Sequence, residues 1–323
     1  MKHFYLLLVG LMLGVFSHAA TDTPDTLIVA RDGSGKFRTV WEALEDCRAF
    51  MDYHKVIFVK KGIYKEKVIV PSWLTNIEIL GEDRDETIIT YDDHANIRMP
   101  GKEVNMGTFR TYTVKVEGND ITFKNITIEN NAPRKGQAVA LHTEGDRLKF
   151  INCRILGNQD TVYTGVAGTR LYFVGCYIEG TTDFIFGPST AWFEACTIHS
   201  KADSYVTAAS TPKDIAYGYV FNSCKLTADA KVKRVCLGRP WRQYGYTLFM
   251  NCELGSHIVP RGWHNWGKVT NEQTARYAEY NNRGEGANVK ERASWSRQLT
   301  AKEAMQVTLK SVFTIKDEWH PLH

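Results

Sequence analysis

The sequence lacks the motifs that identify several large classes of enzyme. It has no Gly-x-Ser-x-Gly segment, the turn on which many serine esterases present their nucleophile. It has no glycine-rich phosphate loop after a strand, and none of its seven cysteines lies in a Cys-x-x-Cys pair or at a Cys/His spacing typical of zinc. These absences argue against serine-esterase chemistry, nucleotide binding and a metal site.

Linkers and long apolar runs are also scarce. There are nine prolines in 323 residues and no Pro-rich or Ser-rich stretch, so we expect one large domain over residues 21–323. The apolar run from Phe4 to Phe16 follows a lysine and precedes small residues, which is the pattern of a secretory signal peptide. It is too short for a confident membrane span. We therefore predict a signal peptide over residues 1–20, cleaved near Ala19/Ala20, and an exported protein that is periplasmic or secreted.

One short phrase is repeated along the rest of the chain. Phe is followed three residues later by Cys or Ile, and two residues further on by Ile or Leu. The six copies are Phe123–Ile128, Phe150–Ile155, Phe173–Ile178, Phe193–Ile198, Phe221–Leu226 and Phe249–Leu254. They begin 27, 23, 20, 28 and 28 residues apart, which is the period of a solenoid.

The phrase also indicates the shape of one coil. Residues two apart share a face of a strand, and an Asn or Gly between Phe and Cys in four copies favours a bend that turns all three side chains inward. We therefore predict an all-β fold, a right-handed parallel β-helix with three internal ladders of side chains. An antiparallel β-sandwich with a chance repeat is the alternative.

The cysteines and two capping motifs fit this architecture. Five of the seven cysteines occupy the same position of the repeat, where parallel side chains suit a disulfide poorly, so we expect small apolar core residues. Capping boxes at Thr39–Glu42 and Thr300–Glu303 predict short helices that cover the ends of the sheets. Apolar spacing extends the first helix to about Phe50.

The repeat brings two carboxylates together. Asp160 and Asp183 each lie seven residues after the cysteine of their repeat, so they should lie on adjacent coils, about 4.8 Å apart at the backbone. Two carboxylates at that distance do not both ionise easily, which suits a division into acid and nucleophile. A pair of surface aspartates is the alternative. Asp203 also follows its cysteine by seven residues, but its coil is longer and the equivalence is less secure.

The neighbouring residues favour a site. Gln159 precedes Asp160, and Gln137 offers a second amide beside an alternating strand. The turn Leu237–Trp241 carries an Arg that can bind a carboxylate and a Trp that can stack on a sugar. The aromatic run Trp263–Trp266 is more easily read as packing under a long loop than as a substrate contact.

Five segments together resemble, in order, the signature motifs of the pectin methylesterases (pectinesterases, carbohydrate esterase family 8). They are Gly62-Ile-Tyr-Lys-Glu66, Gln137-Ala-Val-Ala-Leu141, Gly157-Asn-Gln-Asp-Thr161, Asp183-Phe-Ile-Phe-Gly187 and Leu237-Gly-Arg-Pro-Trp241, and the resemblance runs from about Thr26. It implies a right-handed β-helix that removes methyl esters from homogalacturonan, the backbone of pectin, without a metal or cofactor. We expect no nucleic acid, no membrane association and a monomer.

The resemblance also implies roles for single residues. Asp183 matches the nucleophile, and Asp160 matches the general acid that later acts as base. Gln137 and Gln159 match the oxyanion donors, and Arg239 matches the residue that orients the nucleophile. The residues implied in substrate binding are Trp241, Thr108, Phe186 and Tyr163.

The match is not complete, and two other functions stay open. Val162 stands where the family often has Leu, and Thr111-Tyr112 replaces small residues, so the preferred methylation pattern is uncertain. A β-helical glycoside hydrolase could also use two carboxylates about 5 Å apart, and a lyase acting on the same backbone would normally need a calcium-binding carboxylate cluster that we do not find. A non-catalytic polysaccharide-binding β-helix is the third possibility. The two glutamines favour ester chemistry, since only a tetrahedral intermediate needs oxyanion donors.

Overall fold

The structure is a computed structural model that describes residues 25–314 and 317–322. The predicted signal peptide, residues 1–20, lies outside the described residues. Within them, no helix is long and apolar enough to cross a lipid bilayer.

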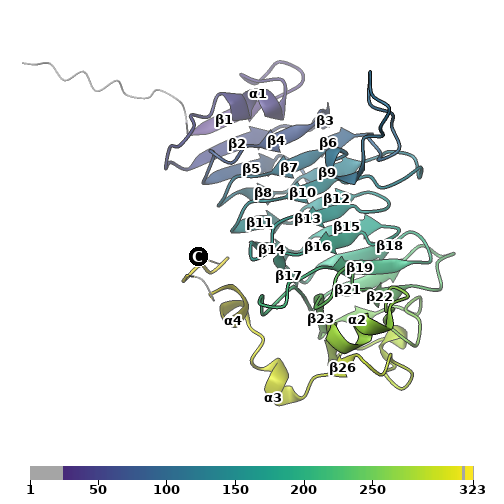
Figure 1. Cartoon of the computed structure of the whole chain (residues 1–323). Helices are drawn as coiled ribbons and strands as arrows, with labels where there is room; N and C mark the ends of the chain where they lie inside the picture. The colour runs from purple at the N-terminus through teal and green to yellow at the C-terminus, as the bar shows by residue number, and fades with distance from the viewer. Residues whose placement is uncertain (1–24, 315–316, 323) are drawn as a thin grey trace, which may run out of the picture.

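Three parallel sheets run along the molecule, and between residues 55 and 238 the chain visits them in turn, so that each coil there adds one strand to each sheet (Figure 1). Sheet A consists of β1 (Thr26–Val29), β2 (Lys55–Val59), β5 (Ile77–Gly81), β8 (Thr122–Lys124), β11 (Leu148–Ile151), β14 (Arg170–Val174), β17 (Thr190–Glu194), β20 (Tyr219–Asn222), β23 (Tyr246–Met250), β25 (Arg276–Tyr280) and β26 (Arg297–Gln298). Sheet B consists of β3 (Gly62–Lys65), β6 (Thr87–Tyr91), β9 (Thr127–Asn130), β12 (Arg154–Leu156), β15 (Tyr177–Gly180), β18 (Thr197–Ser200), β21 (Lys225–Ala228) and β24 (Glu253–Leu254). Sheet C consists of β4 (Val68–Val70), β7 (Val114–Val116), β10 (Leu141–Thr143), β13 (Val162–Thr164), β16 (Ile185–Gly187), β19 (Tyr205–Ala209) and β22 (Cys236–Gly238). The predicted right-handed parallel β-helix is confirmed.

The repeated phrase forms the core. Its six Phe rings are buried and stack on one another from coil to coil, with ring centroids 4.3 to 5.5 Å apart. All seven cysteines are buried and free. Each cysteine of the repeat donates its thiol to the Phe carbonyl of the preceding coil, at 3.3 to 3.6 Å. The prediction of an apolar cysteine ladder is therefore confirmed.

The bend inside the phrase is left-handed in every copy. Asn152 and Asn251 have φ of 50° and 56°, and the Gly175 position has φ 61°. Ala195 adopts the same conformation with φ 50°, although an alanine there costs roughly 1–2 kcal/mol. The Nδ2 of Asn152 also donates to Oδ1 of Asn125 one coil earlier, at 2.9 Å, so the asparagines link coils as well as turning them.

Helix α1 (Val40–Glu45) covers the N-terminal end of the coils and contacts β1, β2 and β4. Its predicted capping box is present. Glu66 adds a second cap, because its carboxylate accepts from the amides of Val40 and Trp41 at 2.9 and 3.0 Å. The first signature motif therefore has a structural task at this carboxylate.

The expectation that this helix extends to Phe50 is wrong. Phe50 has φ 59° and is 85% exposed, and its amide donates to the carbonyl of Trp73 at 2.9 Å. A left-handed residue whose amide is bound elsewhere cannot continue a right-handed helix.

The C-terminal segment closes the other end and then turns back along the molecule. The short helix η2 (Glu285–Ala287) and the half-buried Trp295 pack against the last coil. After it, α3 (Ala301–Ala304) begins with the predicted capping box, and α4 (Leu309–Phe313) contacts β17 on the outer face of sheet A (Figure 1). Two further short helices, η1 (Thr108–Arg110) and α2 (Val269–Thr274), lie in loops.

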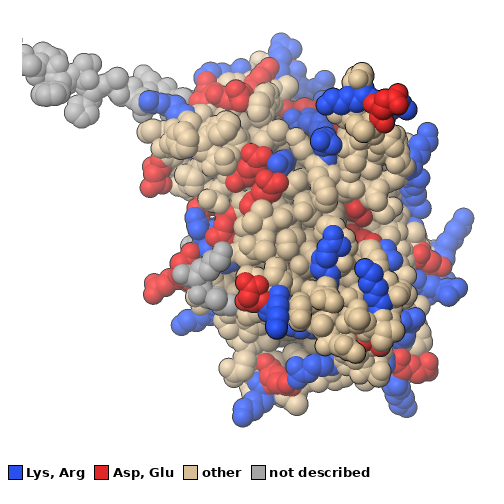
Figure 2. All heavy atoms as spheres, in the orientation of Figure 1, with Lys and Arg blue, Asp and Glu red and all other residues tan. Residues whose placement is uncertain are grey.

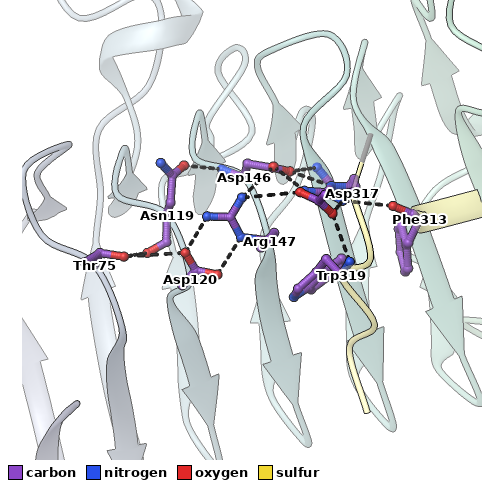
Figure 3. Close-up of polar contacts among 9 residues, drawn as sticks. Thr75, Asn119, Asp120, Asp146, Arg147, Phe313, Asp317 and Trp319 are labelled. Atoms are coloured by element: carbon purple, nitrogen blue, oxygen red, sulfur yellow. Dashed lines mark hydrogen bonds and ion pairs between the residues drawn. The ribbon is translucent and has the colours of Figure 1, made fainter. Parts of the chain in front are cut away.

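Ion pairs fix this C-terminal segment to the coils (Figure 3). The side chain of Arg170 is 4% exposed and binds Asp146 and Asp317 with two donors each, at 2.5 to 3.1 Å. Arg147 pairs with Asp120 at 2.6 Å and lies 3.9 Å from Asp317. Asp317, four residues after the end of α4, is thereby joined to the start of β14, 147 residues earlier in the chain.

We expect Asp317→Asn to lower the free energy of unfolding by about 1 kcal/mol at pH 7, because Asp317 is 46% exposed and Asp146 still pairs with Arg170. Arg170 lowers the pKa of both Asp146 and Asp317 below the ordinary 3.8. A carboxylate with a lowered pKa in the folded state stabilises the protein above its unfolded pKa and loses this effect as the pH falls through its folded pKa.

The variant should therefore lose less stability than the parent protein between pH 5 and pH 3, as measured by urea unfolding. Asp52→Asn, at an exposed position, is the control. Equal unfolding free energies for the Asp317 variant and the parent at pH 7 would contradict the predicted role of this ion pair.

Candidate active site

Asp160 and Asp183 lie where the chain passes from sheet B to sheet C. Each stands two residues before a pair of neighbours in register, Val162 on β13 and Ile185 on β16. The amide of Asp160 donates to the carbonyl of Thr182 at 3.1 Å, so the two aspartates occupy the same place on adjacent coils, about 4.8 Å apart at the backbone. Both are nearly buried, with 8% and 6% of their surface exposed.

The next coil presents a different residue at this place. The amide of Asp183 donates to the carbonyl of Tyr205 at 2.9 Å, so Tyr205 rather than Asp203 lies beside it. Asp203 instead accepts from the amides of Lys233 and Arg234, at 2.7 and 2.9 Å. The extra length of that coil moves Asp203 out of the row, which is why the count of seven residues fails there.

The two glutamines also lie on adjacent coils. The amide of Ala138 donates to the carbonyl of Gln159 at 3.0 Å, so the segment with Gln137 runs beside the segment with Gln159. Both side chains are half-buried, and neither makes a hydrogen bond to another residue in the described part of the chain. Because a carboxamide carries two N–H donors, the site has unused donors next to the aspartates.

Arg239, directly after β22, holds Asp183 from one side. Its Nε donates to Oδ1 at 2.9 Å and its Nη2 to Oδ2 at 2.7 Å, the paired geometry that binds carboxylates best. The guanidinium carbon lies 3.9 Å from the ring centroid of Tyr205 and 3.8 Å from that of Trp266. These flat contacts leave the guanidinium little freedom to turn away from Asp183.

The electrostatic environment acts differently on the pKa values of the two carboxyl groups. Burial raises the pKa of Asp160 well above its usual range, and the charge of Asp183 raises it further. Burial also raises the pKa of Asp183, but the hydrogen bonds and charge of Arg239 oppose that rise. The pKa of Asp160 is therefore raised by burial and by its neighbour's charge, whereas Arg239 favours the ionised form of Asp183.

Aromatic rings line the outer face of sheet C next to the carboxylates. Tyr163 and Phe186 are neighbours in register, with ring centroids 4.7 Å apart. The ring of Trp241 meets Phe186 edge-on at 5.8 Å, and Phe109 lies 4.8 Å from Tyr163. Together they form an aromatic surface whose separate ring faces are of the kind on which sugar rings stack.

The structure thus brings together the predicted Asp160, Asp183, Gln137, Gln159 and Arg239, with Tyr163, Phe186 and Trp241 beside them. Thr108 is different, because no hydrogen bond joins its side chain to the other predicted residues in the described part of the protein. The next residue, Phe109, covers Tyr163 instead.

Three residues of the site were not predicted from the sequence: Phe109, Tyr205 and Trp266. The adjacent Thr108 was the signal for Phe109, whereas the count of one coil beyond Asp183 gives Asp203 and so offered no signal for Tyr205. In the Trp263–Trp266 run, Trp263 is fully buried as expected for packing, whereas Trp266 stacks on Arg239.

No group of three or more His, Cys, Asp or Glu side chains in the described residues is arranged to hold a metal ion. The chemistry that the described side chains themselves can perform is that of a buried acid next to an arginine-bound carboxylate, with free amide donors at hand. This set matches the needs of a reaction that passes through an oxyanion.

Comparison with known proteins gives a consistent answer. The sequence model of the pectinesterase family matches residues 26–317. Pectinesterase 31 of Arabidopsis thaliana is 38% identical over 281 residues, which are 85% of this chain and 88% of that protein. This chain spans only about half the length of other plant relatives, which are named as pectinesterase/pectinesterase inhibitor.

Solved structures agree. Pectin methylesterase from carrot superposes with a TM-score of 0.83 at 33% identity, covering 91% of this chain and 94% of that one. A pectin methylesterase crystallised in complex with a hexasaccharide superposes with a TM-score of 0.78 at 28% identity, covering 91% and 98%.

Proposed function

This chain belongs to the pectinesterase family, and from this we propose that it hydrolyses the methyl esters of homogalacturonan to polygalacturonate and methanol. The observation that carries the proposal is the pairing of a buried Asp160 with an Asp183 held by Arg239, beside two glutamines with free donors. That set has one residue for each task of ester hydrolysis.

In the first step, a carboxylate oxygen of Asp183 attacks the ester carbonyl carbon. The carbonyl oxygen becomes an anion that the side-chain amides of Gln137 and Gln159 bind, and these neutral donors stabilise it without lowering the basicity of Asp183. When the intermediate collapses, the bond to methoxide breaks, and Asp160 gives its proton to the leaving oxygen to form methanol.

In the second step, Asp160 is an anion and can accept a proton. It removes one from a water molecule, whose oxygen attacks the acyl carbon bound to Asp183. Collapse of this second intermediate restores Asp183 and releases the galacturonic acid group, which gives its proton to water and becomes the carboxylate. Asp160 is left protonated, so the site returns to its starting state.

Substrate binding uses the aromatic surface beside the carboxylates. Trp241, Phe186 and Tyr163 offer flat faces for successive sugar rings. Thr108 stays a predicted contact, and Phe109 joins the set because it packs on Tyr163.

We further propose that the protein is an exported monomer whose domain spans residues 21–323. The signal-peptide pattern of residues 1–20 supports export, and the family match over residues 26–317 supports a single domain. N-terminal sequencing of the exported protein tests the cleavage position, and light scattering tests the monomer.

The proposed oxyanion donors lead to a specific prediction. Gln159→Leu should lower kcat for methanol release by about 10²–10³-fold, because one donor to the oxyanion is lost, while KM changes little. Gln137→Leu should have an effect of the same size. Gln298→Leu, on the exposed strand β26, is the control. A loss confined to KM would contradict the oxyanion role.

The function itself is tested by the products formed from highly methylated pectin in the presence of a chelator. Methanol release with no shortening of the chains supports the proposal. New reducing ends would instead indicate a glycoside hydrolase, unsaturated ends a lyase, and binding without any product a non-catalytic module.

A further inference from the structure

The two aspartates of the site stand in turns with a strained backbone. Asp160 has φ 66° and Asp183 has φ 51°, in the left-handed region that residues with a side chain adopt only at a cost in free energy. Such a conformation persists where the surrounding contacts impose it. Gln159 lies in the same turn as Asp160, and its side chain makes no hydrogen bond to another residue in the described part of the chain. The position of this oxyanion donor therefore depends on what holds the turn.

A lysine from a later coil reaches this turn. Lys201 follows β18, on the coil after that of Asp183. Its Nζ donates to the carbonyl of Gly157 at 2.8 Å and to Oε1 of Glu179 at 2.8 Å. Gly157 follows β12 and lies on the coil of Asp160. Glu179 is on β15 and lies on the coil of Asp183. One ammonium group therefore joins three successive coils at the corner that carries the catalytic residues.

The ion pair between Lys201 and Glu179 is largely shielded from solvent. Their side chains are 21% and 19% exposed. Tyr177 also holds the carboxylate, since its hydroxyl donates to Oε2 of Glu179 at 3.0 Å. The main chain of the lysine is fixed as well, because its amide donates to the carbonyl of Gly180 at 2.8 Å. A pair that is anchored at both ends keeps its geometry better than an exposed pair of long side chains does.

A second set of contacts joins the turn to the segment before Gln137. Nε of Arg134 donates to Oδ1 of Asn158 at 3.1 Å, and Nδ2 of Asn158 donates to the carbonyl of Ala132 at 3.2 Å. Nη2 of Arg134 reaches the carbonyl of Lys201 at 3.4 Å. The segments that precede the two oxyanion donors are therefore tied to each other and to Lys201.

We propose that Lys201 is a positioning residue, which holds the turn of residues 157–160 so that the side-chain amide of Gln159 meets the oxyanion. The inference rests on the proposed function. The ammonium group acts through the carbonyl of Gly157, two residues before Gln159. Without this donor the turn can relax from its strained conformation, and a displacement of about 1 Å at a catalytic group is enough to cost much of its effect.

Lys201→Met tests this role, because it keeps an unbranched apolar side chain and removes the donors. The kcat for methanol release should fall about tenfold, which is less than for the loss of a whole oxyanion donor, and KM should change little. Lys201→Arg, which supplies donors again, should keep most of the parent's kcat. Equal kcat in Lys201→Met and the parent protein, or a change confined to KM, overturns the proposal.

The control has to remove the same charge from the same sheet. Figure 2 shows that Lys and Arg side chains gather along the right-hand edge of the molecule, where β15 and β18 end, and losing any of them weakens the attraction of an acidic polymer. Lys225→Met is matched in this respect, because Lys225 is on β21, the next strand of sheet B, and pairs with Glu253 at 3.4 Å. This variant should keep the kcat of the parent protein, and an equal fall in both variants overturns the proposal.

A double-mutant cycle shows whether the lysine acts through Gln159. In a Gln159→Leu background, Lys201→Met should lower kcat by less than about threefold, since the group that it positions is already lost. A further tenfold fall would show that Lys201 acts on another group and would overturn the proposal.

Hydrogen exchange separates this proposal from the function on which it rests. The amides of residues 157–160 should exchange about tenfold faster in Lys201→Met than in the parent protein, and at the parent's rate in Lys225→Met. If the parent releases no methanol from methylated pectin, the proposed function fails, and the exchange rates still decide whether Lys201 holds the turn. Equal exchange in Lys201→Met and the parent overturns that part of the proposal as well.

Discussion

Asp183→Asn should lower the rate of methanol release by at least about 10⁴-fold, because it removes the atom that forms the covalent bond with the acyl carbon. An amide oxygen is a poor nucleophile, and no other carboxylate can replace it, since Asp160 is protonated and points to the leaving group in the proposed mechanism. The measurement is kcat for methanol release from methylated oligogalacturonides, with single-turnover traces to show whether the first step is the one lost.

The same substitution should also destabilise the fold, so its effect should not be confined to catalysis. Asp183 neutralises Arg239, whose side chain is only 19% exposed and lies between Tyr205 and Trp266. Breaking a largely buried pair leaves an uncompensated charge, and we expect a loss of about 2 kcal/mol in the free energy of unfolding, less than for a fully buried pair. The double variant Asp183→Asn/Arg239→Gln should recover part of the stability and none of the activity. Recovery of activity would contradict the assignment of Asp183 as nucleophile.

Asp160→Asn should lower kcat by about 10³–10⁴-fold, because methoxide then leaves without a proton and no base activates water. The effect should depend on the leaving group. With an ester of a more acidic alcohol, which leaves readily as an anion, the substitution should reduce the rate of the first step much less than it does with the methyl ester. Substrates with such esters therefore distinguish a lost general acid from a displaced nucleophile.

Whereas Asp183→Asn should lower the free energy of unfolding, Asp160→Asn should leave it unchanged or raise it. The pKa of Asp160 is raised in the folded state, so its ionisation is disfavoured there, and its contribution to stability is lost as the pH rises through that pKa. The carboxyl makes no hydrogen bond to the described residues, so Asn removes a penalty and breaks no contact. At pH 7 the variant should unfold at the same or a higher urea concentration than the parent protein. A fall of about 2 kcal/mol or more would show that the carboxyl has a structural role that the geometry does not indicate.

Much of the architecture could be predicted from the sequence because the repeat is periodic. Phe150, Cys153 and Ile155 recur at fixed offsets, and strands stacked in parallel require equivalent residues to meet, so their ladders follow from counting. The same count brings Asp160 to Asp183. It fails at Asp203, where two coils differ in length and only the hydrogen bond from Asp183 to Tyr205 reveals the true neighbour.

Helix ends and contacts between distant loops could not be predicted in this way. The left-handed conformation of Phe50 depends on a hydrogen bond to Trp73, and no local pattern indicates that bond. The clamp around Arg239 requires Trp266, which comes from a loop 27 residues further along the chain. Such contacts depend on the paths of the long loops between strands, and the sequences of these loops do not repeat, so the contacts cannot be found by counting residues.

The stacking of coils has a consequence for how such a protein can change. Asp160 and Asp183 come from separate turns of the solenoid, and their spacing is set by main-chain hydrogen bonds rather than by the loops around them. Insertions at the other corners, where the repeats already vary from 20 to 28 residues, can therefore alter which stretches of polymer gain access while the chemical centre stays unaltered. Substrate selectivity and catalytic chemistry therefore depend on different parts of the chain, so related proteins can differ in the first while they keep the second.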